Sequence, residues 1–156
     1  MKTQLIPLLF LLGSHAALAA GPDAHAYAPG HDARVVLPLT PEERAIILDE
    51  MRQFLDAVQK MTAALARQDM PAAAKASRAV GQHMGHAVPP SLRAKLPMEF
   101  RQLGNSVHRD FDQMALDAET LGDVSYSLTQ LSATLQKCVS CHATYQIRTP
   151  ALNTQR

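Results

Sequence analysis

The stretch "VSYSLTQLSATLQKCVSCHATY", residues 124–145, carries the strongest periodic pattern in the chain. Its apolar positions advance by threes and fours, which is the period of one face of an α-helix. These positions are Val124, Leu128, Leu131, Leu135, Cys138, His142 and Tyr145. Both cysteines of the 156-residue chain, Cys138 and Cys141, fall within this helix, and His142 follows directly. We therefore expect this face of the helix to pack into a helical core.

The CVSCH motif has a specific chemical meaning on such a helix. Residues i, i+3 and i+4 share one face, so Cys138, Cys141 and His142 are expected to point the same way, into the core. Two thiols at this spacing can form thioether bonds to the two vinyl groups of one haem, while the imidazole binds the iron. C-x-x-C-H is the attachment signature of c-type haem. We predict one haem c per chain, with the two cysteines as covalent attachment points and His142 as axial iron ligand.

Three other uses of two cysteines are weaker alternatives. A disulfide between Cys138 and Cys141 would close a small loop and restrain little of the unfolded chain. Thiol–disulfide oxidoreductases place the first cysteine at a helix N-terminus within a βαβ pattern, whereas Cys138 lies deep inside the expected helix. A structural zinc site needs four ligands, and the chain has no second cysteine pair.

A first helix is expected from Thr40 to about Arg67. Thr40 can act as N-cap, Pro41 occupies the first helical position, and Glu43 completes the spacing of a capping box. The apolar stripe of this helix is Ile47, Met51, Phe54, Leu55, Val58, Met61 and Leu65. This regular spacing predicts one buried face.

Two further helices complete an all-α domain at residues 40–150. A short, alanine-rich helix is expected from Asp69 toward Gly85, and a third from about Met98 to a stop at Gly122. The Pro-containing segment 86–97 is expected to be a loop between them. Four amphipathic helices with short joints predict an antiparallel four-helix bundle.

The N-terminal segment indicates export. Residues 1–19 combine Lys2, a short apolar run and an Ala-Leu-Ala cleavage site, as in a secretory signal peptide. Residues 20–39 are rich in Pro, Gly and Ala, and we interpret them as a flexible leader. We expect no membrane span beyond the signal peptide. Without Lys2 the chain carries 14 basic and 14 acidic side chains, so it has no excess of positive charge that would indicate nucleic-acid binding.

An exported helical bundle with C-x-x-C-H near its C-terminus resembles the class II cytochromes c, the cytochrome c′ family. The resemblance covers roughly residues 40–148, and its specific part is the last helix, where Tyr145 also matches the family pattern. The family commonly follows this aromatic residue with arginine, whereas Gln146 stands here and Arg148 comes two residues later. The resemblance implies a monohaem protein of the periplasm.

The sixth iron position decides the function that the resemblance implies. Met51 falls near the family's distal position and is the candidate sixth ligand, since thioether sulfur suits haem iron. Methionine is also a common core filler, so an apolar distal pocket closed by Leu48 or Leu55, or a second histidine, are the alternatives. Methionine ligation is typical of an electron carrier, and an apolar pocket is typical of a protein that binds nitric oxide or carbon monoxide.

The sequence favours a carrier of single electrons between redox partner proteins. No substrate-binding motif appears, so we do not expect an enzyme. A homodimer is left open. His83 and His86 stand near a helix end and are expected to be solvated, and His108 is expected at the surface of the third helix.

Overall fold

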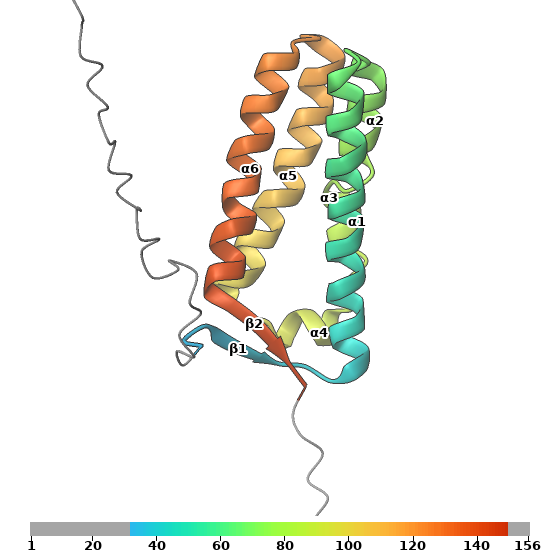
Figure 1. The fold of residues 1–156 in the computed structure, drawn as a ribbon. Coiled ribbons are helices and arrows are strands. Elements are labelled where there is room, and N and C mark those ends of the chain that lie inside the picture. Colours follow the sequence, from blue (N-terminus) through green and yellow to red (C-terminus); the bar gives the residue numbers. More distant parts are fainter. Residues whose placement is uncertain (1–31, 150–156) are drawn as a thin grey trace, which may run out of the picture. The chain divides into compact units, whose positions relative to one another are not determined.

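The computed structural model describes residues 32–149 and consists mainly of helices (Figure 1). The expected signal peptide and most of the expected leader lie outside the described residues. The elements in chain order are β1 (Val35–Pro38), α1 (Pro41–Ala66), α2 (Met70–Arg78), α3 (Gln82–Gly85), α4 (Pro90–Lys95), α5 (Met98–Thr120), α6 (Val124–Thr144) and β2 (Tyr145–Arg148). A mainly helical chain is confirmed, with one strand pair that the sequence did not predict.

Helix α1 begins at the expected capping box. The Glu43 amide donates to the Thr40 hydroxyl at 3.3 Å, and the Thr40 amide donates to the Glu43 carboxylate at 3.0 Å. Lys95 also pairs with Glu43, at 2.6 Å, which ties α4 to the start of α1. Two amides that lack partners inside the helix are therefore satisfied reciprocally.

The single helix expected from Asp69 to Gly85 is instead two helices, α2 and α3. The break lies at Gly81, and the reason is a contact with α5. The Asp112 carboxylate accepts from the Gln82 amide at 3.0 Å and so caps α3. A Cβ atom at Gly81 would lie 1.8 Å from this carboxylate, so only glycine allows the approach.

The segment 86–97, expected as a loop, contains α4. Pro90 stands at its first position, where its fixed φ angle suits a helix start. Leu92 and Leu96 are buried. A short helix forms here because it turns both leucines inward.

Helices α5 and α6 begin and end close to the expected positions. Gly122, with a φ of 64°, ends the turn after α5, and the Asp123 carboxylate caps α6 by accepting from the Tyr126 amide at 3.0 Å. The one difference is at Tyr145, which was expected to continue the helical stripe and instead begins β2.

Strand β1 corrects the expectation of a flexible leader over its last residues. It pairs in parallel with β2, with Val35 opposite Tyr145 and Pro38 opposite Arg148. Leu37 and Leu39 are buried, and Leu39 is only 1% exposed. These two apolar side chains gain a core contact only when the C-terminal segment that contains β2 packs beside β1. Composition alone therefore did not predict the strand.

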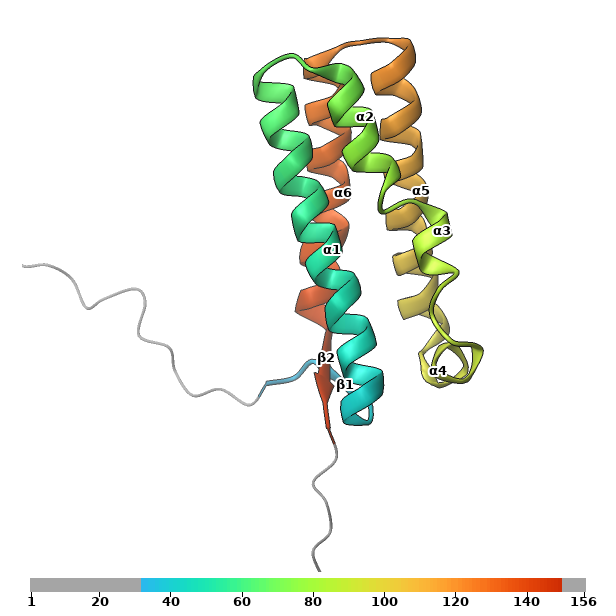
Figure 2. The same cartoon turned by 90° about the vertical axis from the view of Figure 1, so that its right-hand side faces the viewer.

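Helices α1, α2, α5 and α6 lie side by side in both views (Figures 1 and 2). Helix α2 packs against α1 and α5, α5 packs against α6, and α1 contacts α6 more sparsely. Within the part of the chain that the structure describes, no helix is long and apolar enough to cross a membrane.

Two separate hydrophobic clusters hold these elements together. The larger, which we call the upper cluster, is formed by α1, α2, α5 and α6, and its largest buried members are Met61, Phe111 and Met114. The smaller, the lower cluster, is formed by β1, α4, the start of α1, and partly buried residues of α5 and β2. Its buried members are Leu37, Leu39, Ile47, Leu92 and Leu96.

His108 of α5 is buried, contrary to the expectation of a surface position. Its side chain is 3% exposed, with Nδ1 2.8 Å from the Val80 carbonyl oxygen and Nε2 3.0 Å from the Glu50 carboxylate. Both neighbours are acceptors, so the arrangement favours a doubly protonated ring. Burial alone would lower the pKa of His108, but the hydrogen bonds with Glu50 and Val80 outweigh it and raise the pKa.

The raised pKa of His108 makes stability depend on pH. The unfolded group titrates near pH 6.5, so the stabilisation is complete below about that pH and is lost as the pH rises through the higher folded pKa. As the pH rises above about 6.5, the free energy of unfolding, measured in urea, should therefore fall more steeply in the wild type than in His108→Gln.

His86→Gln provides a control, because His86 is exposed. It should keep the wild-type slope. Equal slopes for the wild type and His108→Gln would contradict the assigned ion pair.

Candidate functional site

The residues of the CVSCH motif lie between the two clusters. On each long helix, a residue that packs in the lower cluster marks one end of a stretch, and a residue that packs in the upper cluster marks the other end. The bounds, which include partly buried side chains packed against a cluster, are Ile47 and Phe54 on α1, Phe100 and Val107 on α5, and Leu131 on α6 with Tyr145 directly after it. We call the layer inside these bounds the middle level. It contains Met51 of α1, Gly104 of α5, and Cys138, Cys141 and His142 of α6.

Cys138 and Cys141 are half-buried, and neither forms a disulfide. Burial raises the pKa of both thiols, and the negative charge of Asp110 adds to the effect at Cys138. Reactive catalytic cysteines need a lowered pKa and commonly stand at a helix N-terminus. These two stand near the C-terminal end of α6, so they are neutral thiols at neutral pH rather than a thiolate nucleophile.

His142 is exposed, which corrects the expectation that all three motif residues point into the core. Its carbonyl oxygen accepts a hydrogen bond from the Arg34 guanidinium at 3.3 Å. Among residues 32–149, no side chain or backbone group forms a hydrogen bond or ion pair with its imidazole. The exposed imidazole is thus accessible to a ligand.

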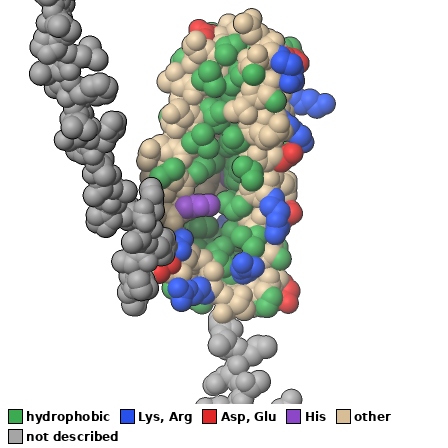
Figure 3. Space-filling model, in the orientation of Figure 1, with side chains coloured by type: hydrophobic (Ala, Val, Ile, Leu, Met, Phe, Trp, Pro, Cys, Tyr) green, Lys and Arg blue, Asp and Glu red, His purple; other side chains and the backbone are tan. Residues whose placement is uncertain are grey.

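Large apolar side chains around the motif are accessible to solvent. Leu55 of α1 is 71% exposed and Leu135 of α6 is 39% exposed, while Met51 is half-buried. These apolar side chains are therefore open to solvent rather than sealed in the core. Figure 3 shows hydrophobic side chains along the seam between α6 and α1, and this face is hollowed in its lower half.

Polar contacts between helices fix the relative heights of the site residues. Glu50 of α1 contacts His108 of α5 at 3.0 Å, and Asp110, half a turn further along α5, pairs with Lys137 of α6. Helices α1 and α5 run in the same direction and α6 runs in the opposite one (Figure 1). Met51, which follows Glu50, therefore lies close to the height of the first cysteine.

Side-chain direction brings Met51 and His142 closer than their Cα positions suggest. The side chains of a helix lean toward its N-terminus. Met51 therefore leans toward the lower cluster, whereas His142, on the antiparallel α6, leans toward the upper cluster. Along the bundle axis, the Met51 and His142 side chains therefore lean toward one another.

The other histidines are less suited to bind a ligand at this level. Both ring nitrogens of His108 are engaged, and His83 and His86 are exposed at α3. Within residues 32–149, no group of three or more His, Cys, Asp or Glu side chains is placed to hold a metal ion by itself.

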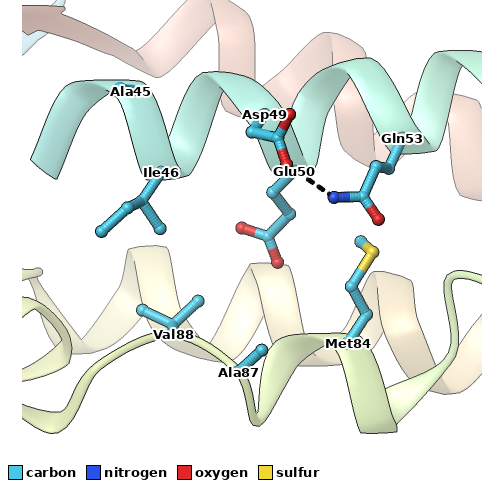
Figure 4. A pocket seen from close by; sticks show the side chains of 8 residues that line it. All are labelled: Ala45, Ile46, Asp49, Glu50, Gln53, Met84, Ala87 and Val88. Atoms are coloured by element: carbon cyan, nitrogen blue, oxygen red, sulfur yellow. Dashed lines mark hydrogen bonds between the residues drawn. The ribbon is translucent and has the colours of Figure 1, made fainter. Parts of the chain in front are cut away.

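A separate cavity of about 330 Å³ lies between α1 and residues 84–88 (Figure 4). It is lined by Ala45, Ile46, Asp49, Glu50, Gln53, Met84, Ala87 and Val88. Ile46 and Val88 point toward one another across it, and Gln53 donates to Asp49 at 2.8 Å. The two carboxylates have partners within the protein, so the cavity contains no unpaired charge aimed at a ligand.

Sequence reasoning singled out the motif and Met51, whose roles stay predictions. It placed His108 at the surface and did not single out Glu50 or Gly104. Gly104 could have been found, because a glycine inside an apolar stripe of a helix is an irregularity of the pattern. Glu50 and His108 gave no such signal.

Comparison with known proteins yields no relative for this chain. No family model, no curated protein and no solved structure matches it.

The raised thiol pKa can be tested on the chain produced without cofactor. The rate at which iodoacetamide alkylates the two thiols rises with pH as the thiolate forms. The midpoint of this rise should lie at a higher pH in the folded chain than in the same chain unfolded in urea, since burial disfavours the thiolate. The rate is followed by mass spectrometry across the pH range. A folded midpoint at or below the unfolded one would contradict the assignment of neutral, half-buried thiols.

Proposed function

We propose that this protein is a c-type cytochrome that holds one haem covalently through Cys138 and Cys141, with His142 as axial iron ligand. The observation that carries the proposal is the position of the motif in the middle level. Within residues 32–149, two free thiols and an imidazole without a hydrogen-bond partner stand there, and Leu55 and Leu135 nearby remain open to solvent.

The donor set fits the chemistry of haem attachment. Cys138 and Cys141 would hold the haem by adding across its two vinyl groups, each forming one carbon–sulfur bond while the thiol hydrogen passes to the other vinyl carbon. The addition needs no external oxidant, and neutral thiols are the form that supplies both atoms. The imidazole of His142 is free to bind iron without breaking a hydrogen bond within the described chain.

The apolar surface also fits a flat hydrophobic macrocycle. Covering a fully exposed leucine contributes roughly 1.5–3 kcal/mol, and Leu55 and Leu135 are both partly available for this contact. The cofactor would thus join the upper and lower clusters into one apolar core.

The proposed architecture is an antiparallel four-helix bundle of the class II cytochrome c type. Its helices would be α1, α2 extended by α3, α5 and α6. The alternating directions of these helices in Figure 1 and the order of their contacts support this arrangement. The family assignment rests on this arrangement together with the position of C-x-x-C-H near the end of α6.

The activity that we propose is the transfer of single electrons between redox partner proteins in the periplasm. Haem supplies the one-electron chemistry, through iron that alternates between ferric and ferrous states. The chain's own residues bind and orient the cofactor: Cys138 and Cys141 anchor it, His142 sets the proximal side, and Leu55 and Leu135 restrict water.

Met51 is the proposed sixth ligand. Its height, its partial exposure and the lean of its side chain toward His142 all support this role. The second candidate function is the binding of nitric oxide or carbon monoxide at an apolar distal site. The exposed Leu55, one turn from Met51, is the observation that favours it, because this residue could close such a site without binding iron.

Covalent attachment is the first test of the proposal. In a periplasmic expression host that attaches haem, the wild-type chain should retain haem through denaturation and stain for peroxidase activity on a gel. Cys138→Ala with Cys141→Ala should yield a chain without stain, because no thioether bond can form. Ser140→Ala, between the two cysteines, should stain as the wild type does. An unstained wild-type chain would refute the proposed function.

The role of Met51 is tested by comparison with Met61, which is fully buried and accepts a hydrogen bond from the Ser77 hydroxyl at 3.1 Å. Met51→Ala should change the iron toward high spin, lower the reduction potential and let carbon monoxide bind. Met61→Ala should leave the spectrum unchanged and lower the free energy of unfolding by roughly 2–5 kcal/mol.

Optical spectra of both oxidation states and urea unfolding measure these effects. Unchanged spectra for Met51→Ala would show that Met51 is core filling, and the gas-binding function would then be favoured.

A further inference from the structure

Gly104 of α5 differs from the glycines near α3. A Cβ atom at Gly81 would lie 1.8 Å from Asp112, and one at Gly85 would lie 2.8 Å from the His108 ring, so both positions require glycine for packing. A Cβ atom at Gly104 would meet no atom within 4 Å. Packing within the described chain therefore does not explain this glycine.

Gly104 also lies on the inward face of α5. Phe100 precedes it by four residues, and Val107 and Phe111 follow it by three and seven, which places all four residues on one face. Phe100 packs on the lower cluster, whereas Val107 and Phe111 belong to the upper cluster. Within the middle level this face carries the partly buried Leu103, and beside it Gly104, which has no side chain.

The register between α5 and α6 places Gly104 beside the motif. Asp117 accepts from Gln130 at 2.6 Å, and Asp110 pairs with Lys137. The two contacts are seven residues apart on each helix, so a step toward the start of α5 corresponds to an equal step toward the end of α6. Both helices rise by roughly 1.5 Å per residue. Six residues before Asp110, Gly104 therefore lies at the height of Ala143, directly after His142 and two residues beyond Cys141.

A glycine inside a helix is costly. Relative to alanine it lowers the folding equilibrium constant by about two- to fivefold, because the unfolded chain gains freedom. Nothing in the packing of the described residues around Gly104 offsets this cost, so a role in binding is the physical explanation that remains.

We propose that Gly104 is a haem-contact residue: the missing side chain lets the flat face or edge of the macrocycle approach the α5 backbone next to the height of His142. The inference rests on the proposed function, since it requires a haem attached at the motif. It assigns α5 a direct part in cofactor binding, opposite the covalent attachment on α6.

Gly104→Leu tests the proposal, with Asn105→Leu as matched control, because Asn105 is exposed and adds the same side chain one position away. Haem per chain is measured as the pyridine haemochrome, and free thiols are counted by alkylation. We expect Gly104→Leu to reduce covalent haem per chain at least tenfold and to leave both cysteines free. Asn105→Leu should remain within twofold of the wild type.

Gly104→Ala keeps the test decisive if the larger variant does not fold. In the chain produced without haem, it should raise the folding equilibrium constant by about two- to fivefold, as alanine does in a helix. In the haem-bearing chain the gain should vanish or reverse, since the methyl group meets the macrocycle. Circular dichroism during urea unfolding measures both forms.

The outcomes separate this inference from the proposed function. A wild-type chain without covalent haem would overturn both. A wild-type chain with haem would leave the proposed function standing, and this inference would then be overturned by normal haem content in Gly104→Leu, or by equal stabilisation of both forms in Gly104→Ala.

Discussion

The structure depends on the separation of its apolar core into two clusters. The upper cluster fixes α1, α2, α5 and α6 around Phe111, and the lower cluster fixes the other end of α1 and α5, and β2 directly after α6, around Leu39 and Leu92. Helices held at both ends keep their spacing over the stretch between, even where their own side chains do not fill it. The middle level is the consequence: a layer with apolar walls that lies at the height of two thiols and an imidazole.

Polar contacts at the border of this layer set its dimensions. The buried pair of His108 and Glu50 joins α5 to α1, and Asp110 joins α5 to α6 through Thr134 and Lys137. Removing one partner of a buried ion pair leaves an uncompensated charge, so such pairs hold helices in one register. That register brings Met51 and the motif to a common height.

The strand pair fixes the end of α6 directly after the motif. Arg34 donates to the His142 carbonyl at 3.3 Å, and Gln146 donates to the Arg34 carbonyl at 3.2 Å. Tyr145 packs edge-on against Phe100, with ring centroids 5.2 Å apart. The last turn of a helix leaves carbonyl groups without partners, and here the N-terminal strand supplies one. The proposed axial ligand therefore stands on a restrained turn rather than on a fraying helix end.

The sequence by itself determined the features that depend on neighbours within a few residues: the capping box at Thr40, the bounds of α1, α5 and α6, and the i, i+3, i+4 spacing of the motif. Tertiary structure alone decided the break at Gly81, the burial of His108, the exposure of His142 and the pairing of β1 with β2. Three of these features need a partner tens of residues away: Asp112 for Gly81, Glu50 for His108, and Tyr145–Arg148 for the first strand. Local periodicity records which face of a helix is apolar, but only the packing of whole helices decides how far along its length that face is covered.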